Sequence, residues 1–184
     1  MLIFLFCKNL SCLATSFNDK TLLEGVDKME KNLNKKSFAC KFLIIIQILL
    51  GVGAFFGGLL LIIDPSGNLM SMPISLLDEA PFSNFLIPGI ILLVVLGIIP
   101  LVVSFALITK WNLGAANSLN IFAKMHWSWT YSLYIGFALI IWITLETFFL
   151  KEVALVHLLY IGIGLTIQAV TLLPSVQQYY SQKG

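Results

Sequence analysis

Four long apolar runs limit what this chain can fold into. They cover residues 42–63, 86–108, 127–150 and 153–173, and each has about 21 to 24 residues. A helix needs about 20 apolar residues to cross the hydrocarbon core of a bilayer. In a chain of 184 residues, these runs leave too little sequence for a soluble domain. They predict an all-α, polytopic membrane protein with four transmembrane helices in an antiparallel bundle.

The composition supports a membrane protein and excludes several classes of function. Charged residues make up only 11% of the chain, whereas soluble domains carry roughly 25%. The three cysteines, Cys7, Cys12 and Cys40, precede the first run and form no CxxC pair, which argues against a thiol oxidoreductase and against structural disulfides. We expect the lipid bilayer, rather than a nucleic acid, as the environment of this chain.

The lysines indicate how the helices are oriented. They occur before the first run, between the second and third runs, and after the fourth run: Lys31, Lys35, Lys36, Lys41, Lys110, Lys124 and Lys183. The connection at residues 64–85 has no lysine and carries three acids, and Lys151 lies beside Glu152. Because cytoplasmic loops are enriched in Lys and Arg, we predict a multi-pass inner-membrane protein with both termini in the cytoplasm. Residues 1–40 are then a cytoplasmic segment, 41–174 the membrane domain and 175–184 a cytoplasmic tail.

The first 28 residues differ from the rest of the chain. They fit the pattern of a signal peptide poorly, because no basic residue precedes the short apolar stretch and no proper cleavage pattern follows it. Codons for Glu24-Gly25-Val26 can contain a ribosome-binding sequence at a suitable distance from Met29. We therefore expect Met29 to be the true start and residues 1–28 to be a translated leader. The alternative is a short N-terminal extension.

Small residues in the first run predict close helix packing. Gly53 and Gly57 are four residues apart, as are Ala54 and Gly58, and this spacing lets helix backbones approach each other. The same face could bind a second copy of the chain or another membrane protein.

Polar and helix-breaking residues inside the runs predict two further features. Gly97 and Pro100 predict a kink in the second run. Gln47 and Gln168 lie at similar depths in the first and fourth runs, and they are expected to bond across helices.

The connection at residues 64–85 is too apolar for an ordinary solvated loop. It opens with Asp64-Pro65-Ser66-Gly67, which has the residues of a type I turn, and continues with Leu and Met residues. We expect a short interfacial helix on the outer membrane surface. The alternative is a segment that caps the bundle.

The outer connection carries a resemblance to known proteins. Asp64-Pro65-Ser66-Gly67, Pro73, Leu76-Leu77, Pro81-Phe82 and Pro88-Gly89 resemble a group of small, uncharacterised bacterial four-span membrane proteins. The resemblance covers roughly residues 50 to 173. It implies the four-span topology and brings no activity, cofactor or ligand.

Three polar residues form a candidate functional cluster. Glu146 is the only acid well inside an apolar run, and such residues are functional candidates because a charge in the membrane is costly. His157 lies at a similar depth in the next run, and Asp64 ends the first run at nearly the same level. The cluster could carry a proton or bind a cation, whereas the alternative for Glu146 and His157 is a structural pair. No metal-binding spacing is present, and no cofactor is expected, because His126 and His157 lie at opposite faces and cannot share one haem.

Three functions are consistent with these features. The first is a non-enzymatic accessory or structural membrane component, which fits the absence of a recognisable catalytic set. The second is a small oligomeric transporter or channel that uses Glu146. The third is a membrane enzyme with Asp64, Glu146 and His157 at its outer face. We predict the accessory role.

Overall fold

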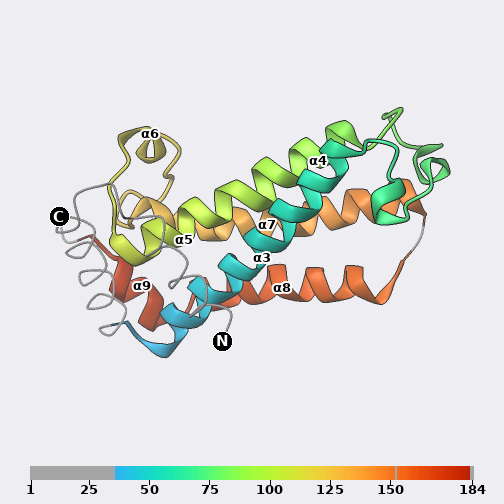
Figure 1. Cartoon of the computed structure of the whole chain (residues 1–184). Helices are drawn as coiled ribbons and strands as arrows, with labels where there is room; N and C mark the ends of the chain where they lie inside the picture. The colour runs from blue at the N-terminus through green and yellow to red at the C-terminus, as the bar shows by residue number, and fades with distance from the viewer. Residues whose placement is uncertain (1–35, 152, 183–184) are drawn as a thin grey trace, which may run out of the picture. The chain divides into compact units, whose positions relative to one another are not determined.

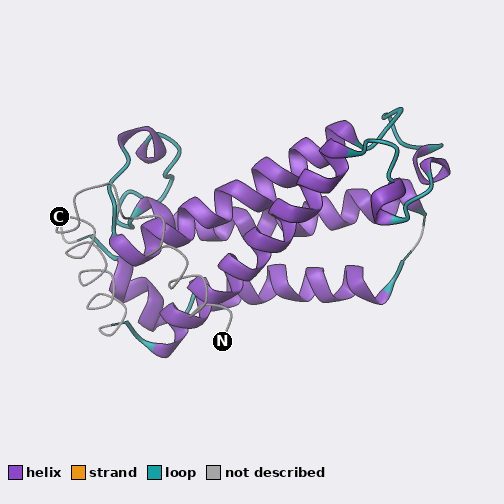
Figure 2. Ribbon diagram, in the orientation of Figure 1, coloured by secondary structure: helices purple, strands orange, loops and turns teal. Residues whose placement is uncertain are grey.

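The computed structural model describes residues 36–151 and 153–182, which are helical and contain no β-strand (Figure 2). An isolated β-bridge joins Met125 to Ser181. Residues 36–184 form one compact unit, and the predicted leader and most of the N-terminal segment lie outside the described residues.

The first long helix, α3, covers Phe38–Ile63 and begins four residues before the first apolar run. Ser37 caps its N-terminus, because the Ser37 hydroxyl accepts a hydrogen bond of 3.3 Å from the Cys40 N–H. The helix ends at Asp64, where Pro65 follows and restricts the preceding backbone. Its 26 residues correspond to about 39 Å, which exceeds the thickness of a bilayer core.

The second long segment is continuous but changes its helical form. It consists of α4 (Leu86–Ile91), a π-helical stretch η3 (Leu92–Ile98) and α5 (Ile99–Thr109). Pro100 follows the π-helical stretch and lacks an N–H, so a regular α-helical bond at this point could not form. The π-helical stretch lies on the N-terminal side of the proline, and the kink that Gly97 and Pro100 predict stays a prediction.

The last two long runs pair with each other. Helix α7 covers Trp127–Leu150, and α8 covers Leu155–Thr171 (Figure 1). The sequence predicted one helix over residues 153–173, but α8 is shorter, and a bend of 63° separates it from α9 (Pro174–Tyr180). Pro174 fits the first turn of a new helix because that position needs no N–H partner. The expected tail thus contains a helix in which Val176 and Tyr180 are buried.

Three helices of the described residues match predicted spans in length and composition. Phe38–Ile63, Leu86–Thr109 and Trp127–Leu150 are each long and apolar enough to cross a membrane. The bent pair α8 and α9 adds a fourth if it is counted as one span. The described residues therefore contain three or four helices that could span a membrane, as expected for a membrane protein.

The connection after α3 contains two short 3₁₀ helices, η1 (Asn68–Met70) and η2 (Ile74–Leu77), in place of one interfacial α-helix. Leu77 and Phe85 are buried against Leu61 near the end of α3. The connection therefore covers the end of the bundle. A second short helix, α6 (Gly114–Asn117), lies in the connection between α5 and α7.

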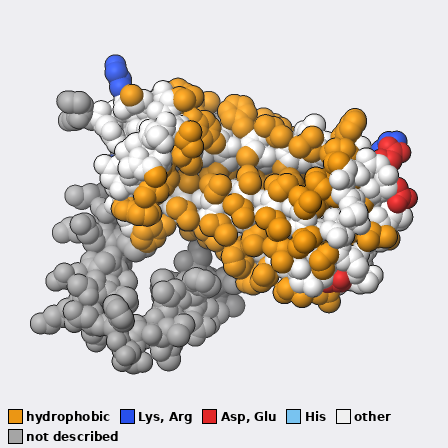
Figure 3. All heavy atoms as spheres, turned by 90° about the horizontal axis from the view of Figure 1, so that it is seen from above, with side chains coloured by type: hydrophobic (Ala, Val, Ile, Leu, Met, Phe, Trp, Pro, Cys, Tyr) orange, Lys and Arg blue, Asp and Glu red, His pale blue; other side chains and the backbone are white. Residues whose placement is uncertain are grey.

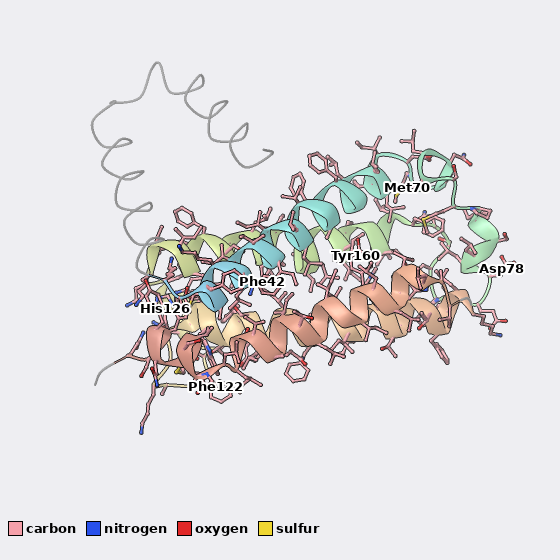
Figure 4. The ribbon with its side chains drawn as sticks, turned by 90° about the horizontal axis from the view of Figure 1, so that it is seen from below. Phe42, Met70, Asp78, Phe122, His126 and Tyr160 are labelled. Atoms are coloured by element: carbon pink, nitrogen blue, oxygen red, sulfur yellow. The ribbon has the colours of Figure 1, made fainter. Side chains whose placement is uncertain are left out.

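Charge separates the two ends of the bundle. The acidic end holds the connection after α3, with Asp64, Asp78 and Glu79, and the basic end holds Lys36, Lys41, Lys110 and Lys124. Figure 3 shows hydrophobic side chains over the middle of the visible face and acidic side chains gathered at one end. Figure 4 places Met70 and Asp78 at the acidic end and His126 at the opposite end.

Glycines set the closest helix crossings. A methyl group at Gly58 would lie 2.7 Å from the Gly89 carbonyl oxygen, so α3 and α4 are in backbone contact there. Gly136 and Gly164 give α7 and α8 an equivalent crossing, since a methyl group on either would lie 3.0–3.1 Å from the other's carbonyl oxygen. Small residues therefore hold the bundle as two closely packed helix pairs.

Candidate functional site

A cavity of about 420 Å³ lies in the half of the bundle nearer the acidic end. Helices α3 and α8 lie together near the basic end and diverge toward the acidic end in Figures 1 and 4. Residues from α3, α4, η3, α7 and α8 line the space between them. The cavity lies within the size range of small-molecule sites, which is about 300–1,000 Å³.

The lining is mostly apolar and aromatic. Side chains of the connection after α3 cover its outer side: Met70, Met72, Leu77, Ala80, Phe82 and Phe85. Helix α7 contributes one face at a spacing of three and four residues: Leu139, Trp142, Ile143, Glu146 and Phe149. Tyr160 extends from α8 toward α3 and α4 (Figure 4). Such a lining suits a ligand with a large apolar body.

The predicted packing residues of α3 divide between two roles. Gly58 is buried at the crossing with α4, and Ala54 is also buried. Gly53 and Gly57 line the cavity, as Ala54 also does, and a methyl group at Gly53 would meet no atom within 4 Å. The missing side chains at these two positions leave room for the cavity. Gly51 and Gly97, which the sequence did not single out as a pair, make the additional close contact between α3 and η3.

Glu146 is the acidic residue of the cavity lining. Trp142, one turn earlier on α7, and His157 of α8 also line the cavity and carry polar groups. Among the described residues, no lysine or histidine nitrogen lies within 4 Å of its carboxylate. Lys151, the lysine of the acidic end, forms an exposed ion pair with Glu79 instead. The carboxylate therefore faces an apolar cavity without a cationic partner in the described part of the chain.

His157 also lines the cavity. Its Nδ1 atom accepts a hydrogen bond of 3.0 Å from the Ala154 N–H, at the N-terminus of α8. An imidazole that accepts at one nitrogen carries its proton on the other, and it is then neutral. His157 therefore has Nε2–H as its donor and supplies no positive charge to Glu146 in this arrangement.

Asp64 does not join Glu146 and His157. It is absent from the cavity lining, and its carboxylate instead accepts hydrogen bonds from Ser66 and from the Leu69 N–H. These bonds, led by that of the Ser66 hydroxyl, hold the pKa of Asp64 below its usual value. The side chain closes the turn that begins the connection. The predicted three-residue cluster is thus reduced to two, and within residues 36–151 and 153–182 no group of three His, Cys, Asp or Glu residues could hold a metal.

The expected bond between Gln47 and Gln168 is not formed. Both polar side-chain atoms of Gln47 and the Nε2 of Gln168 are buried without a hydrogen-bond partner in the described region. Gln168 packs against Gly136 at the crossing of α7 and α8. Its position shows that helix packing, rather than polar pairing, determines where this side chain lies.

Side-chain hydrogen bonds join helices at the basic end. The indole N–H of Trp129 donates to the Thr171 carbonyl at 2.8 Å, and the Tyr180 hydroxyl donates to the Leu107 carbonyl at 2.8 Å. These two side chains join α7 to α8 and α9 to α5. His126, at the start of α7, is buried, and desolvation lowers its pKa.

Two lysines at the basic end hold carbonyls of other helices, and Lys36 is buried while Lys110 is exposed. The sequence did not predict these contacts. The Lys36 ammonium donates to the Ile108 carbonyl at 2.9 Å. The Lys110 ammonium donates to the Tyr179 carbonyl at 2.9 Å and lies 4.0 Å from the centre of the Tyr179 ring. Burial lowers the pKa of Lys36 to about 8, because the charged form loses hydration. These contacts join residues that are far apart in the sequence, so sequence spacing could not predict them.

Comparison with known proteins adds no family. No family model matches the chain, and neither a curated protein nor a solved structure matches it. The resemblance to small bacterial four-span proteins therefore stays a prediction, and the cavity is the feature that supports a function.

Proposed function

We propose that the chain is a four-span inner-membrane protein whose basic end faces the cytoplasm. The separation of lysines from acids between the two ends supports this orientation. On this proposal, α8 and α9 together supply the fourth span, and the acidic end lies at the outer surface.

The topology can be tested with single cysteines at Ser83 and Ser118, which lie in the connections at opposite ends. An impermeant maleimide applied to intact cells should label Ser83→Cys and not Ser118→Cys. Labelling of Ser118→Cys alone would reverse the orientation. A variant with no introduced cysteine gives the background from the native thiols.

We further propose that the protein acts by binding rather than by catalysis, as an accessory membrane component that holds an apolar molecule in the cavity. The observation that supports this role is the apolar cavity itself, built from four helical segments and the connection after α3. Gly53 and Gly57 keep one wall free of side chains. Because α3 and α8 diverge beside it, a molecule dissolved in the bilayer has a lateral route of entry.

Filling the cavity tests this role. Gly53→Leu places a side chain in the cavity without a backbone clash, since no atom lies within 4 Å of the new Cβ. Gly162→Leu is the matched control, because Gly162 also has open space around it and is outside the cavity lining. In phosphatidylcholine nanodiscs, saturable binding of radiolabelled dodecanol should be lost in Gly53→Leu and retained in Gly162→Leu. Equal binding by both variants, or no saturable binding by the unmodified protein, would contradict the proposal.

A small oligomeric transporter that uses Glu146 is the second candidate. It is favoured by one observation, the position of the Glu146 carboxylate in the cavity lining. Four helices with few polar residues offer a poor solute path, so this function requires assembly. Mass photometry of the protein in nanodiscs tests it, and a monomer would contradict it. The enzyme hypothesis requires Asp64, Glu146 and His157 in one site. It is the least favoured, because Asp64 is outside the cavity lining.

A further inference from the structure

The cavity combines an apolar interior with one carboxyl group, that of Glu146, which has no ion pair among the described residues. Glu146 lies four residues, or about 6 Å, from the end of α7 at Leu150. At this depth an ionised carboxylate is costly, although less so than at the centre of a bilayer, where the cost is about 3 kcal/mol or more. A cation placed beside it would offset part of that cost.

The described residues near the acidic end do not provide that cation. Lys151 is paired with Glu79 on the exposed surface. His157 accepts a hydrogen bond at Nδ1 and would have to break it in order to become a cation. The Trp142 indole offers a neutral N–H. An ionised Glu146 would therefore take its counter-ion from outside these residues.

We propose that this cavity binds a lipophilic amine, with its apolar body among α3, α7 and α8 and its ammonium beside Glu146. This inference rests on the proposed binding function and names the chemical class of its ligand. The Glu146 carboxylate is the counter-ion and hydrogen-bond acceptor of the ammonium. The rings of Trp142 and Tyr160 line the same cavity, and aromatic faces attract cations.

A single positive charge fits better than the headgroup of a bilayer phospholipid. The cavity lining offers one carboxylate and no lysine to balance a phosphate. The phosphate of a zwitterionic lipid would bring a second negative charge close to Glu146. A free amine with an alkyl or aromatic body brings only the charge that is missing.

The test compares ligands that share one alkyl chain and differ in the head group. Radiolabelled dodecylamine and dodecanol are bound to the full-length protein in phosphatidylcholine nanodiscs at pH 7, with empty nanodiscs as background. The amine should bind about tenfold more tightly than the alcohol, which corresponds to about 1.4 kcal/mol. Glu146→Gln should abolish this preference and keep the binding of dodecanol.

The outcomes separate this inference from the proposed function. Saturable dodecanol binding that Gly53→Leu removes, together with no preference for the amine, would overturn the inference and leave the cavity function standing. A preference that survives Glu146→Gln would overturn it too. Absence of saturable binding for both ligands would overturn the proposed function itself. Loss of amine binding in phosphatidylethanolamine nanodiscs would identify a bilayer aminophospholipid as the occupant and contradict the free amine.

Discussion

The basic end and the acidic end of the bundle use polar residues in different ways. At the basic end, two buried side chains donate to carbonyls on other helices, Trp129 to Thr171 and Tyr180 to Leu107. Gln47 and Gln168, in the same half of the bundle, have no partner among the described residues. At the acidic end, α3 and α8 diverge, and Glu146 faces an apolar cavity without an ion pair in the described region. Side-chain hydrogen bonds join the helices at the basic end, whereas the acidic end keeps a carboxyl group in a cavity wall, a costly feature that a binding site would need.

Replacing one tryptophan at each end should give the largest difference in the free energy of unfolding between the two ends. Trp129 is 3% exposed and donates a buried hydrogen bond, so Trp129→Ala should lower the free energy of unfolding by about 3 kcal/mol or more. Trp142→Ala, on the same helix, enlarges a cavity that already exists and should cost about 1 kcal/mol. Unfolding in mixed micelles of increasing SDS content measures both. Equal losses would show that the two ends are equally well packed.

A smaller contrast is expected from two tyrosines. Tyr180→Phe removes the hydroxyl donor and leaves the buried Leu107 carbonyl unpaired, which should cost about 1–2 kcal/mol. Tyr160 lines the cavity and donates no hydrogen bond to another described residue, so Tyr160→Phe should change stability by less than about 0.5 kcal/mol. The same SDS titrations apply. A large loss for Tyr160→Phe would mean that its hydroxyl has a structural partner.

The basic end should become more stable as the pH rises from about 8 to 10.5. Burial lowers the pKa of Lys36 from 10.5 to about 8, so within this window the unfolded chain binds a proton that the folded chain does not. The full shift corresponds to about 3 kcal/mol, which is an upper bound for the expected rise.

Two lysine variants isolate this effect. Lys36→Met should lose the rise between pH 8 and 10.5, while Lys124→Met, at an exposed lysine of the same end, should retain it. Melting temperatures recorded across this window in detergent provide the measurement. A rise that persists in Lys36→Met would assign it to another group.

The smallest expected effect has the opposite sign. Glu146→Gln keeps the shape of the side chain and removes a charge that lacks a cationic partner in the described region. Without added amine, the variant should be equal in stability to the unmodified protein or about 0.5 kcal/mol more stable. Thermal unfolding in detergent at pH 7 measures this. A clear loss of stability would make Glu146 a structural anchor and remove the contrast with the basic end.

Part of the candidate site could be predicted from the sequence. Glu146 and His157 lie near the ends of helices joined by a short connection, so helix rise alone places them at one depth. Asp64 met the same depth criterion but was excluded by local chemistry, because its carboxylate closes the turn with Ser66 and Leu69. Depth along an axis does not determine the direction in which a side chain points.

The helices follow from the sequence, because apolar runs of sufficient length satisfy their own backbone hydrogen bonds in a bilayer. The lateral arrangement of the helices does not follow from the sequence. Glycine spacing shows which helix backbones can approach each other, but it does not show which ones are in contact. Gly58 meets Gly89, whereas Gly53, five residues earlier on the same helix, meets no atom within 4 Å. Only tertiary packing decided that α3 would lean away from α8, and that divergence converts four apolar runs and one acid into a cavity with a charge in its wall.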